Sequence, residues 1–171
     1  MDKIRIMLVF MGMTLLQGAK AQTSAPGVTV DTTITGFHYA TNFSGTLVYT
    51  KHGPSDIDGH SQPTAFSVTL TRTVTFEQAK KEVLQMFRMS ALNGYTITGE
   101  AEKDTVVNGR PAHLIWYTEA KANEGYQNVV FNAIVKGDGA VLVFTSGDLD
   151  KGKYVDLFKK TFYSIASAQF P

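Results

Sequence analysis

An α+β fold, in which two amphipathic helices pack on a sheet of mainly antiparallel strands, is the fold class that the sequence predicts. Three observations lead to it. Short segments rich in β-branched residues recur along the chain, and several of them are joined by turn sequences. Two stretches, residues 75–92 and 153–167, instead carry apolar residues at helical spacing. The resulting order of strands, helix, strands and helix is typical of helices that pack on one sheet.

The first part of the chain contains three predicted strands, at residues 28–35, 45–51 and 66–73. The first of these is rich in valine and threonine, and the third alternates apolar residues with serine and threonine, as expected for a half-buried strand. The polar segment 52–64 between the second and third is interrupted by glycine and proline, so we expect a loop there.

The first helix is predicted to begin at Thr75, whose hydroxyl can accept from the backbone of Gln78 while the Gln78 side chain reaches back. Gly94 is a suitable residue for the end of this helix, because glycine tolerates the left-handed conformation. One face is apolar and consists of Phe76, Ala79, Val83, Met86 and Phe87.

Five further strands and a final helix complete the prediction. The strands are expected at residues 95–99, 105–107, 112–118, 127–135 and 140–146. Asn108-Gly109 and residues 136–139 have the composition of hairpin turns. Because residues 140–146 are apolar on both faces, we place that strand at the centre of the sheet. The final helix carries its apolar residues on one stripe, at Val155, Phe158, Phe162 and Ile165.

The N-terminus has the pattern of a secretory signal peptide, in which basic residues precede the apolar run 6–16 and small residues follow it. We expect cleavage between Ala21 and Gln22, so that residues 1–21 are the signal peptide and residues 22–171 form a single domain. The apolar run is too short to cross a bilayer, which takes roughly 20 residues. The sequence therefore predicts a periplasmic or secreted protein with no membrane span after cleavage.

Charge and cysteine content exclude several functional classes. Removing residues 1–21 takes away three of the 16 basic and one of the 15 acidic side chains, which leaves a net charge near −1 and no basic run for nucleic acid. The chain contains no cysteine, so thiol nucleophiles, cysteine-ligated zinc and disulfides are excluded.

The loop His52–His60, HGPSDIDGH, contains the side chains that most resemble a reactive or metal-binding site. His52, Asp56, Asp58 and His60 are suitable ligands for zinc or manganese. One proline and two glycines leave their geometry undefined, and an exposed loop between strands accounts equally for the composition. We favour the loop and assign no catalytic, metal or cofactor residue.

Other candidate sites are weaker. Asp148 and Asp150 resemble half of a calcium loop, but the position that needs a glutamate is Lys159, and a turn with Asp150 near the helix N-terminus is the favoured interpretation. Residues 137–142 lack the third glycine of a dinucleotide motif.

His113 lies on a predicted strand and is interpreted as a packed or hydrogen-bonded residue. Pairing of acidic residues for catalysis is not specified, and the candidates are Glu100, Glu102, Asp104 and Glu119. Three aromatic residues belong either to a binding face or to the core, and these are Trp116, Tyr117 and Tyr126.

The hairpin VNGRPAHLIWY, residues 107–117, and the final helix KYVDLFKKTFYSIA, residues 153–166, resemble the PsbP/Mog1/DcrB-like family, in particular its exported bacterial members. The similarity covers residues 66–166. It implies an α-β-α sandwich with a central antiparallel sheet and an accessory or binding role without catalysis. The matching residues form a turn and core positions, so no catalytic motif is carried over.

The predicted function is therefore an exported, non-enzymatic accessory or binding protein of the cell envelope, which needs no cofactor and binds a protein or envelope component through a sheet face and loops. One alternative is a metal-dependent hydrolase that uses the His52–His60 loop. Another is a carrier of a small apolar ligand.

Overall fold

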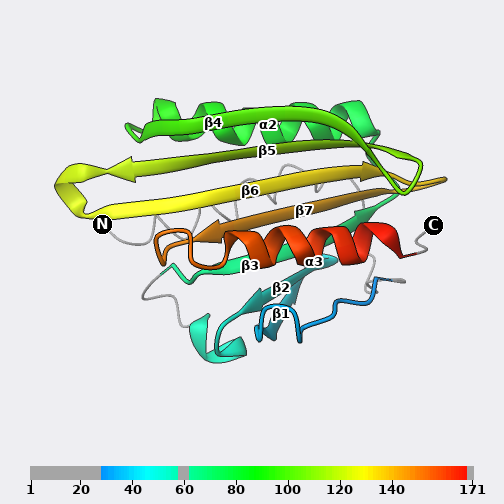
Figure 1. Ribbon diagram of the computed structural model, residues 1–171, viewed down its shortest axis with the longest axis horizontal. Helices are drawn as coiled ribbons and strands as arrows, with labels where there is room; N and C mark the ends of the chain where they lie inside the picture. Colours follow the sequence, from blue (N-terminus) through cyan, green and yellow to red (C-terminus); the bar gives the residue numbers. More distant parts are fainter. Residues whose placement is uncertain (1–27, 58–61, 169–171) are drawn as a thin grey trace.

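Residues 28–57 and 62–168 are described by a computed structural model of the chain, and they form one seven-stranded antiparallel sheet with a helix on each face (Figure 1). The strand order is β1-β2-β3-β7-β6-β5-β4. The strands are β1 (His38–Phe43), β2 (Thr46–Thr50), β3 (Ala65–Thr71), β4 (Thr96–Val107), β5 (Arg110–Lys121), β6 (Tyr126–Lys136) and β7 (Val141–Asp148). The helices are α2 (Phe76–Leu92) and α3 (Val155–Ser167), with short 3₁₀ turns η1 (Gly53–Asp56) and η2 (Ala122–Glu124). The predicted signal peptide, residues 1–21, lies outside the described residues.

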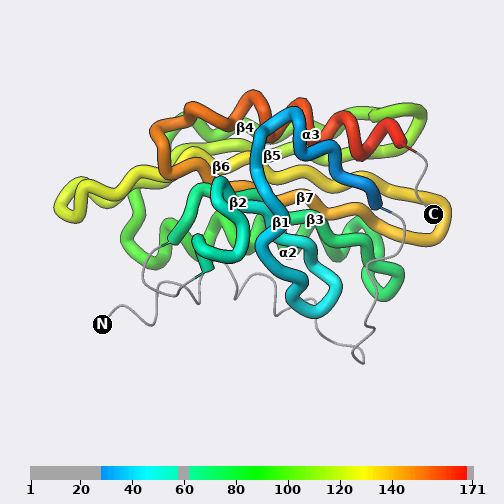
Figure 2. Tube along the Cα trace, turned by 90° about the horizontal axis from the view of Figure 1, so that it is seen from below, coloured from blue at the N-terminus to red at the C-terminus, as the bar shows by residue number. Residues whose placement is uncertain are grey.

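The two helices pack on opposite faces of the sheet, as expected for the sandwich (Figure 2). On the α3 face, Phe158 and Phe162 pack against aromatic residues of the sheet such as Phe144. On the α2 face, Ala79 and Val83 pack against smaller apolar side chains, which are Ile115, Ile134, Val141 and Val143. The predicted central strand is β7, which lies between β3 and β6. The fold class is therefore confirmed.

Helix α2 begins and ends where the sequence predicts. Thr75 Oγ1 accepts a hydrogen bond from the backbone N–H of Gln78 at 3.2 Å, and Gln78 Oε1 accepts from the Thr75 N–H at 2.8 Å. At the other end Asn93 closes the helix, and Gly94 follows it with φ of +79°. These local interactions fix the helix over β5 and β6 at a defined length.

The predicted strand at residues 28–35 is wrong. Asp31 Oδ1 accepts hydrogen bonds from the N–H of Thr33 at 3.0 Å and from its hydroxyl at 2.6 Å, and this side-chain competition turns the backbone. The first strand of the sheet is instead β1, which begins at His38, three residues after the end of the predicted strand, and which was not predicted from the sequence.

The two short strands predicted at residues 95–99 and 105–107 are one long strand, β4. Its pairing with β5 shifts register between Thr98 and Ala101, where Gly99 has φ of +63°. A register irregularity of this kind bends a strand without ending it. The glycine and the charged residues after it have the composition of a loop, and for this reason the sequence predicted two strands. The turn at Asn108-Gly109 is confirmed.

Candidate functional site

The described part of the His52–His60 loop is folded back on itself. His52 Nδ1 lies 2.9 Å from Asp56 Oδ1, and the His52 N–H donates to Asp56 Oδ2 at 2.9 Å across the turn η1. Asp58 and His60 lie outside the described residues. Within residues 28–57 and 62–168, no three histidine, aspartate or glutamate side chains are arranged to hold a metal ion.

His113 belongs to a different part of the sheet from that loop. Strands β3, β7 and β6 separate it from the end of β2, a distance of about 19 Å at the usual strand spacing. The imidazole is fully buried, and its Nδ1 lies 2.9 Å from Asp104 Oδ1 on β4. Lys80 of α2 donates to the same carboxylate at 2.8 Å. His113 is therefore the hydrogen-bonded sheet residue that the sequence predicted.

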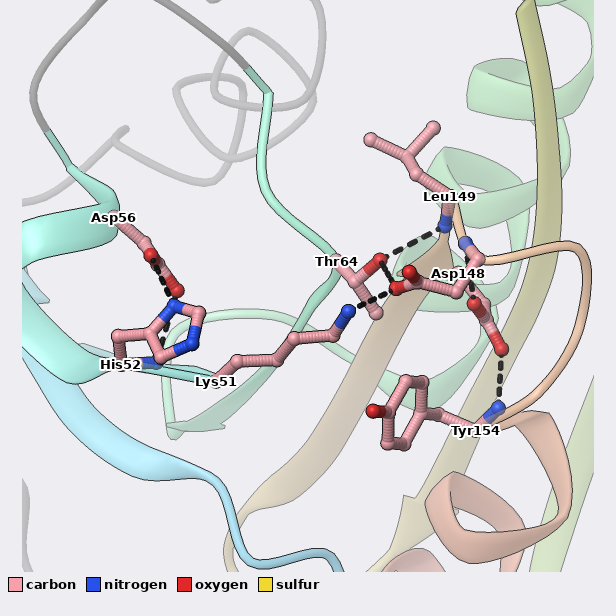
Figure 3. Close-up of polar contacts among 8 residues, drawn as sticks. Lys51, His52, Asp56, Thr64, Asp148, Leu149 and Tyr154 are labelled. Atoms are coloured by element: carbon pink, nitrogen blue, oxygen red, sulfur yellow. Dashed lines mark hydrogen bonds and ion pairs between the residues drawn. The ribbon is translucent and has the colours of Figure 1, made fainter.

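Asp148 and Asp150 form a structural clasp at the start of α3 and are not arranged as a calcium loop (Figure 3). Asp148 is fully buried and accepts hydrogen bonds from the backbone N–H groups of Asp150 and of Tyr154, the residue that precedes α3. The carboxylate at the N-terminus of this helix is therefore that of Asp148, whereas the sequence predicted Asp150 there. Asp150 instead pairs with Lys51 and accepts from the Thr64 hydroxyl. The hydrogen bond from Lys51, followed by that from Thr64, lowers the pKa of Asp150 below its usual range. The clasp ties the ends of β2 and β7 to the start of β3.

The aromatic residues considered for a binding face are largely covered by the helices. Tyr117 is buried under α2, with its ring centroid 5.0 Å from that of Phe87. Trp116 is half-buried on the α3 face, where Lys159 Nζ lies 5.9 Å from its ring. Around Trp116 and Tyr117, the two faces of the sheet are therefore occupied by the protein's own helices.

The edge strand β1 is the part of the sheet that offers exposed aromatic side chains. Tyr39 and Phe43 are 49% and 41% exposed. The strand HYATNF contains no lysine, arginine, aspartate or glutamate. As an edge strand it carries backbone N–H and C=O groups on the side away from β2. Turn η1 lies against its first residues, where a Cβ atom on Gly53 would be 3.1 Å from the Tyr39 carbonyl oxygen. Turn η1 therefore covers the first half of the edge.

Sequence reasoning missed this edge because the strand has six residues and little apolar alternation. A signal was present in Ser44-Gly45, which follows the strand and adopts φ of +51° and +90°. A pair of residues that both need positive φ between β-rich segments is typical of a hairpin turn.

No family model matches the chain, and no curated protein matches it. Several solved structures are similar in arrangement, LpqN and PA94 among them. LpqN of Mycobacterium tuberculosis, described as involved in cell envelope biogenesis, has a TM-score of 0.48 and 18% identity, over 83% of this chain and 80% of that one. PA94 of Pseudomonas aeruginosa, described as a protein of unknown function, has a TM-score of 0.43 and 15% identity, over 65% and 76%. The likeness is limited to the broad arrangement of sheet and helices.

Proposed function

We propose that this chain is an exported, non-enzymatic binding protein of the cell envelope, and that it binds an extended segment of a partner protein along the edge strand β1. The signal-peptide pattern of residues 1–21 supports export. The resemblance of residues 66–166 to the PsbP/Mog1/DcrB-like family, of which we propose it is a member, supports an accessory role. No helix within residues 28–57 and 62–168 is long and apolar enough to cross a membrane.

The single observation that carries the proposal is the uncharged aromatic edge of β1. An exposed strand edge is a template for pairing, and soluble proteins usually block it with charges. Here half-exposed Tyr39 and Phe43 stand on opposite faces of an edge that has no charged side chain. An extended peptide can pair with such an edge through its backbone while its alternate side chains contact these rings.

The use of the polar side chains supports a role without catalysis. His113 is bonded to Asp104, His52 to Asp56, and Asp148 to two backbone groups at the start of α3. Each of these side chains has a partner within the fold, and His113 Nε2, which makes no hydrogen bond, is buried away from solvent. The interface between α3 and the sheet is filled by phenylalanine rings with centroids 5.4–6.0 Å apart, which favours a packed core there over a carrier cavity.

Site-specific photo-crosslinking in the native envelope tests this proposal. A benzoylphenylalanine is placed at Tyr39 or Phe43, and the matched control carries it at Val106, an exposed apolar residue on the opposite edge strand β4. We expect one discrete partner segment to be crosslinked from both β1 positions and not from Val106. Equal crosslinking from all three positions would show non-specific contact and would contradict the proposal.

A synthetic peptide with the crosslinked sequence then tests backbone pairing. N-methylation of alternate amides removes the hydrogen-bond donors on one side of an extended peptide. We expect one of the two N-methylated series to lose binding and the other to retain it, because only one side faces β1. Retained binding in both series, or a crosslinked segment that comes from a second copy of this chain, would refute pairing with a partner protein.

A further inference from the structure

A buried carboxylate without a cationic partner lies on the α2 face, where the β5–β6 hairpin extends toward its end. Glu119 is 8% exposed, and Asn128 is directly opposite it in the register of β5 and β6. Asn128 Nδ2 donates to Glu119 Oε1 at 2.9 Å, and the Tyr126 hydroxyl donates to the same oxygen at 3.2 Å. Among the described residues no lysine, arginine or histidine forms an ion pair with Glu119. A buried carboxylate in this situation is usually paired.

Asn128 adds a second acceptor that has no donor. Its side chain is 3% exposed, and its Oδ1 has no hydrogen-bond partner. The orientation of the amide is fixed, because exchanging its oxygen and nitrogen would place an oxygen against the Glu119 carboxylate. A Cβ atom on Gly147 would lie 3.0 Å from Asn128 Oδ1, so the glycine gives the amide its room against β7. The site therefore lacks a donor and not an acceptor.

The surroundings also favour a positive charge. Burial, and next the charge of Glu119, raise the pKa of both Tyr117 and Tyr126 well above the usual range, which keeps these phenols protonated and neutral. The last turn of α2 contains no basic residue, and a helix C-terminus attracts cations. This end of α2 lies close by, since Phe87 stacks edge-on against Tyr117, two residues before Glu119 on the same face of β5.

The ammonium group of Lys121 lies near Glu119 but is bound by other residues. Lys121 lies two residues beyond Glu119 on β5, and its Nζ is 4.7 Å from the centroid of the Tyr95 ring. The same ammonium is 3.6 Å from Glu124 Oε1. The Tyr95 ring in turn packs edge-on against Tyr126, with centroids 5.3 Å apart. Lys121 is thus held by Glu124 and the ring, and it forms no ion pair with Glu119.

We propose that Glu119 and Asn128 form a binding site for a primary ammonium group, such as that of a lysine side chain. The ammonium would donate to Glu119 and to Asn128 Oδ1, since a lysine ammonium carries three hydrogen-bond donors and no acceptor. Glu119 Oε1 already accepts two hydrogen bonds, which disfavours the bidentate fork of a guanidinium. Calcium takes six to eight oxygen ligands, whereas this site offers one carboxylate and one amide oxygen.

The test is an NMR titration of the purified protein with Nα-acetyl-lysine amide. Nα-acetyl-norleucine amide has a similar stem without the ammonium group, and Nα-acetyl-arginine amide carries a guanidinium. We expect saturable shifts of the Asn128 side-chain amide with the lysine compound, and at least about tenfold weaker binding of the other two. Equal binding of the lysine and norleucine compounds, or no saturable shift with either, would overturn the proposal.

Two variants locate the site. Glu119→Gln keeps the shape and removes the charge, and we expect roughly ten- to hundredfold weaker binding. Its matched control is Glu77→Gln at the opposite end of α2, which should bind as the wild type does. Gly147→Ala keeps Glu119 but displaces the Asn128 amide, and it carries the test if Glu119→Gln fails to fold. Unchanged affinity in the folded variants would refute the site. The β1 proposal is independent of this outcome, because it concerns the opposite end of the strand order.

Discussion

The two edge strands of the sheet, β1 and β4, differ in how they are protected. Strand β4 carries Glu100, Glu102, Lys103 and Asp104, and Lys80 of α2 holds the last of these at 2.8 Å. Strand β1 has no charged residue and exposes Tyr39 and Phe43. Both strands have a register irregularity and both are joined to their neighbour by a two-residue turn with positive φ. The difference therefore lies in the side chains and not in the backbone.

This comparison indicates which edge is available for pairing. Charges on an edge strand oppose the approach of another chain, and an ion pair to a helix also fixes the strand against the body of the protein. At β1 the comparable protection found within residues 28–57 and 62–168 is the turn η1 against its first residues. The charges of β4 oppose a further strand there, whereas the proposed pairing would add one at β1.

The largest effect is expected when β1 is made to resemble β4. In the double variant Tyr39→Lys and Phe43→Lys, we expect binding of the crosslinked partner peptide to fall by about 30-fold or more, since aromatic contact residues commonly contribute ~2 kcal/mol or more. The free energy of unfolding should change little, because both side chains are half-exposed. Fluorescence anisotropy and urea unfolding measure the two quantities.

The matched control for this double variant is Val106→Lys on β4, which is 64% exposed. It should bind the peptide as the wild type does. If lysine on either edge weakened binding equally, the effect would be one of overall charge, and the distinction between the edges would be lost.

A smaller effect is expected when β4 is made to resemble β1. Replacing Glu100 and Lys103 by threonine leaves the net charge unchanged and removes two exposed charges from the edge. We expect concentration-dependent self-association in sedimentation velocity, because the strand edge then lacks its protection. The control is Asp156→Asn with Lys160→Gln on exposed positions of α3, which should remain unassociated. Self-association of both variants would attribute the effect to general surface polarity.

The sequence predicted the parts of the fold that depend on local chemistry. The capping box at Thr75 and the turn at Asn108-Gly109 are short-range interactions, and both are confirmed. The failures have a physical cause as well. At residues 28–35, hydrogen bonds to the Asp31 side chain form a turn despite the β-rich composition. At Gly99, the register irregularity interrupts the pattern of β4, so that one strand was predicted as two.

The candidate sites were less predictable, because they depend on which strands become neighbours. The sequence places Glu119 and Asn128 nine residues apart without indicating that they are opposite each other, or that Gly147 makes room for the amide. Likewise, the position of β1 at the edge depends on the pairing of β3 with β7, which joins residues 70 or more positions apart. Conversely, His52, which the sequence offered as a candidate metal ligand, makes its hydrogen bond to Asp56 within the same loop.

Acid should weaken two ion pairs, one at the β4 edge and one in the clasp beyond the end of β2, and this provides a subtler comparison. The hydrogen bond from Lys80, and then that from His113, lower the pKa of Asp104, and Lys51 does the same to Asp150 near the β1 side. A carboxyl whose pKa is lower in the folded state stabilises the fold above its unfolded pKa of about 3.9, and that contribution is lost as the pH falls through the folded value. We therefore expect the urea concentration at the midpoint of unfolding to decrease as the pH is lowered below about 4. This decrease should be less steep in the variants Asp104→Asn and Asp150→Asn. Asp138→Asn, in an exposed turn, should follow the wild type. Steeper acid sensitivity in either of the first two variants would contradict the assigned ion pairs.

The smallest changes in the free energy of unfolding are expected from substitutions in the turns of the two edge hairpins. Ser44 adopts φ of +51° at the β1–β2 turn, and Asn108 adopts +49° at the β4–β5 turn. Asparagine tolerates this conformation better than serine, so Ser44→Asn should raise the free energy of unfolding by roughly 0.5 kcal/mol. Asn108→Ser should lower it by about 1 kcal/mol, because Asn108 Nδ2 also donates to the carbonyl oxygen of Ser167 at 3.1 Å and so ties its turn to the end of α3. Urea unfolding measures both, and equal and opposite changes would mean that this bond contributes nothing. A larger loss in Asn108→Ser would show that β4 is also the more firmly anchored edge, as its charges and its ion pair to α2 suggest.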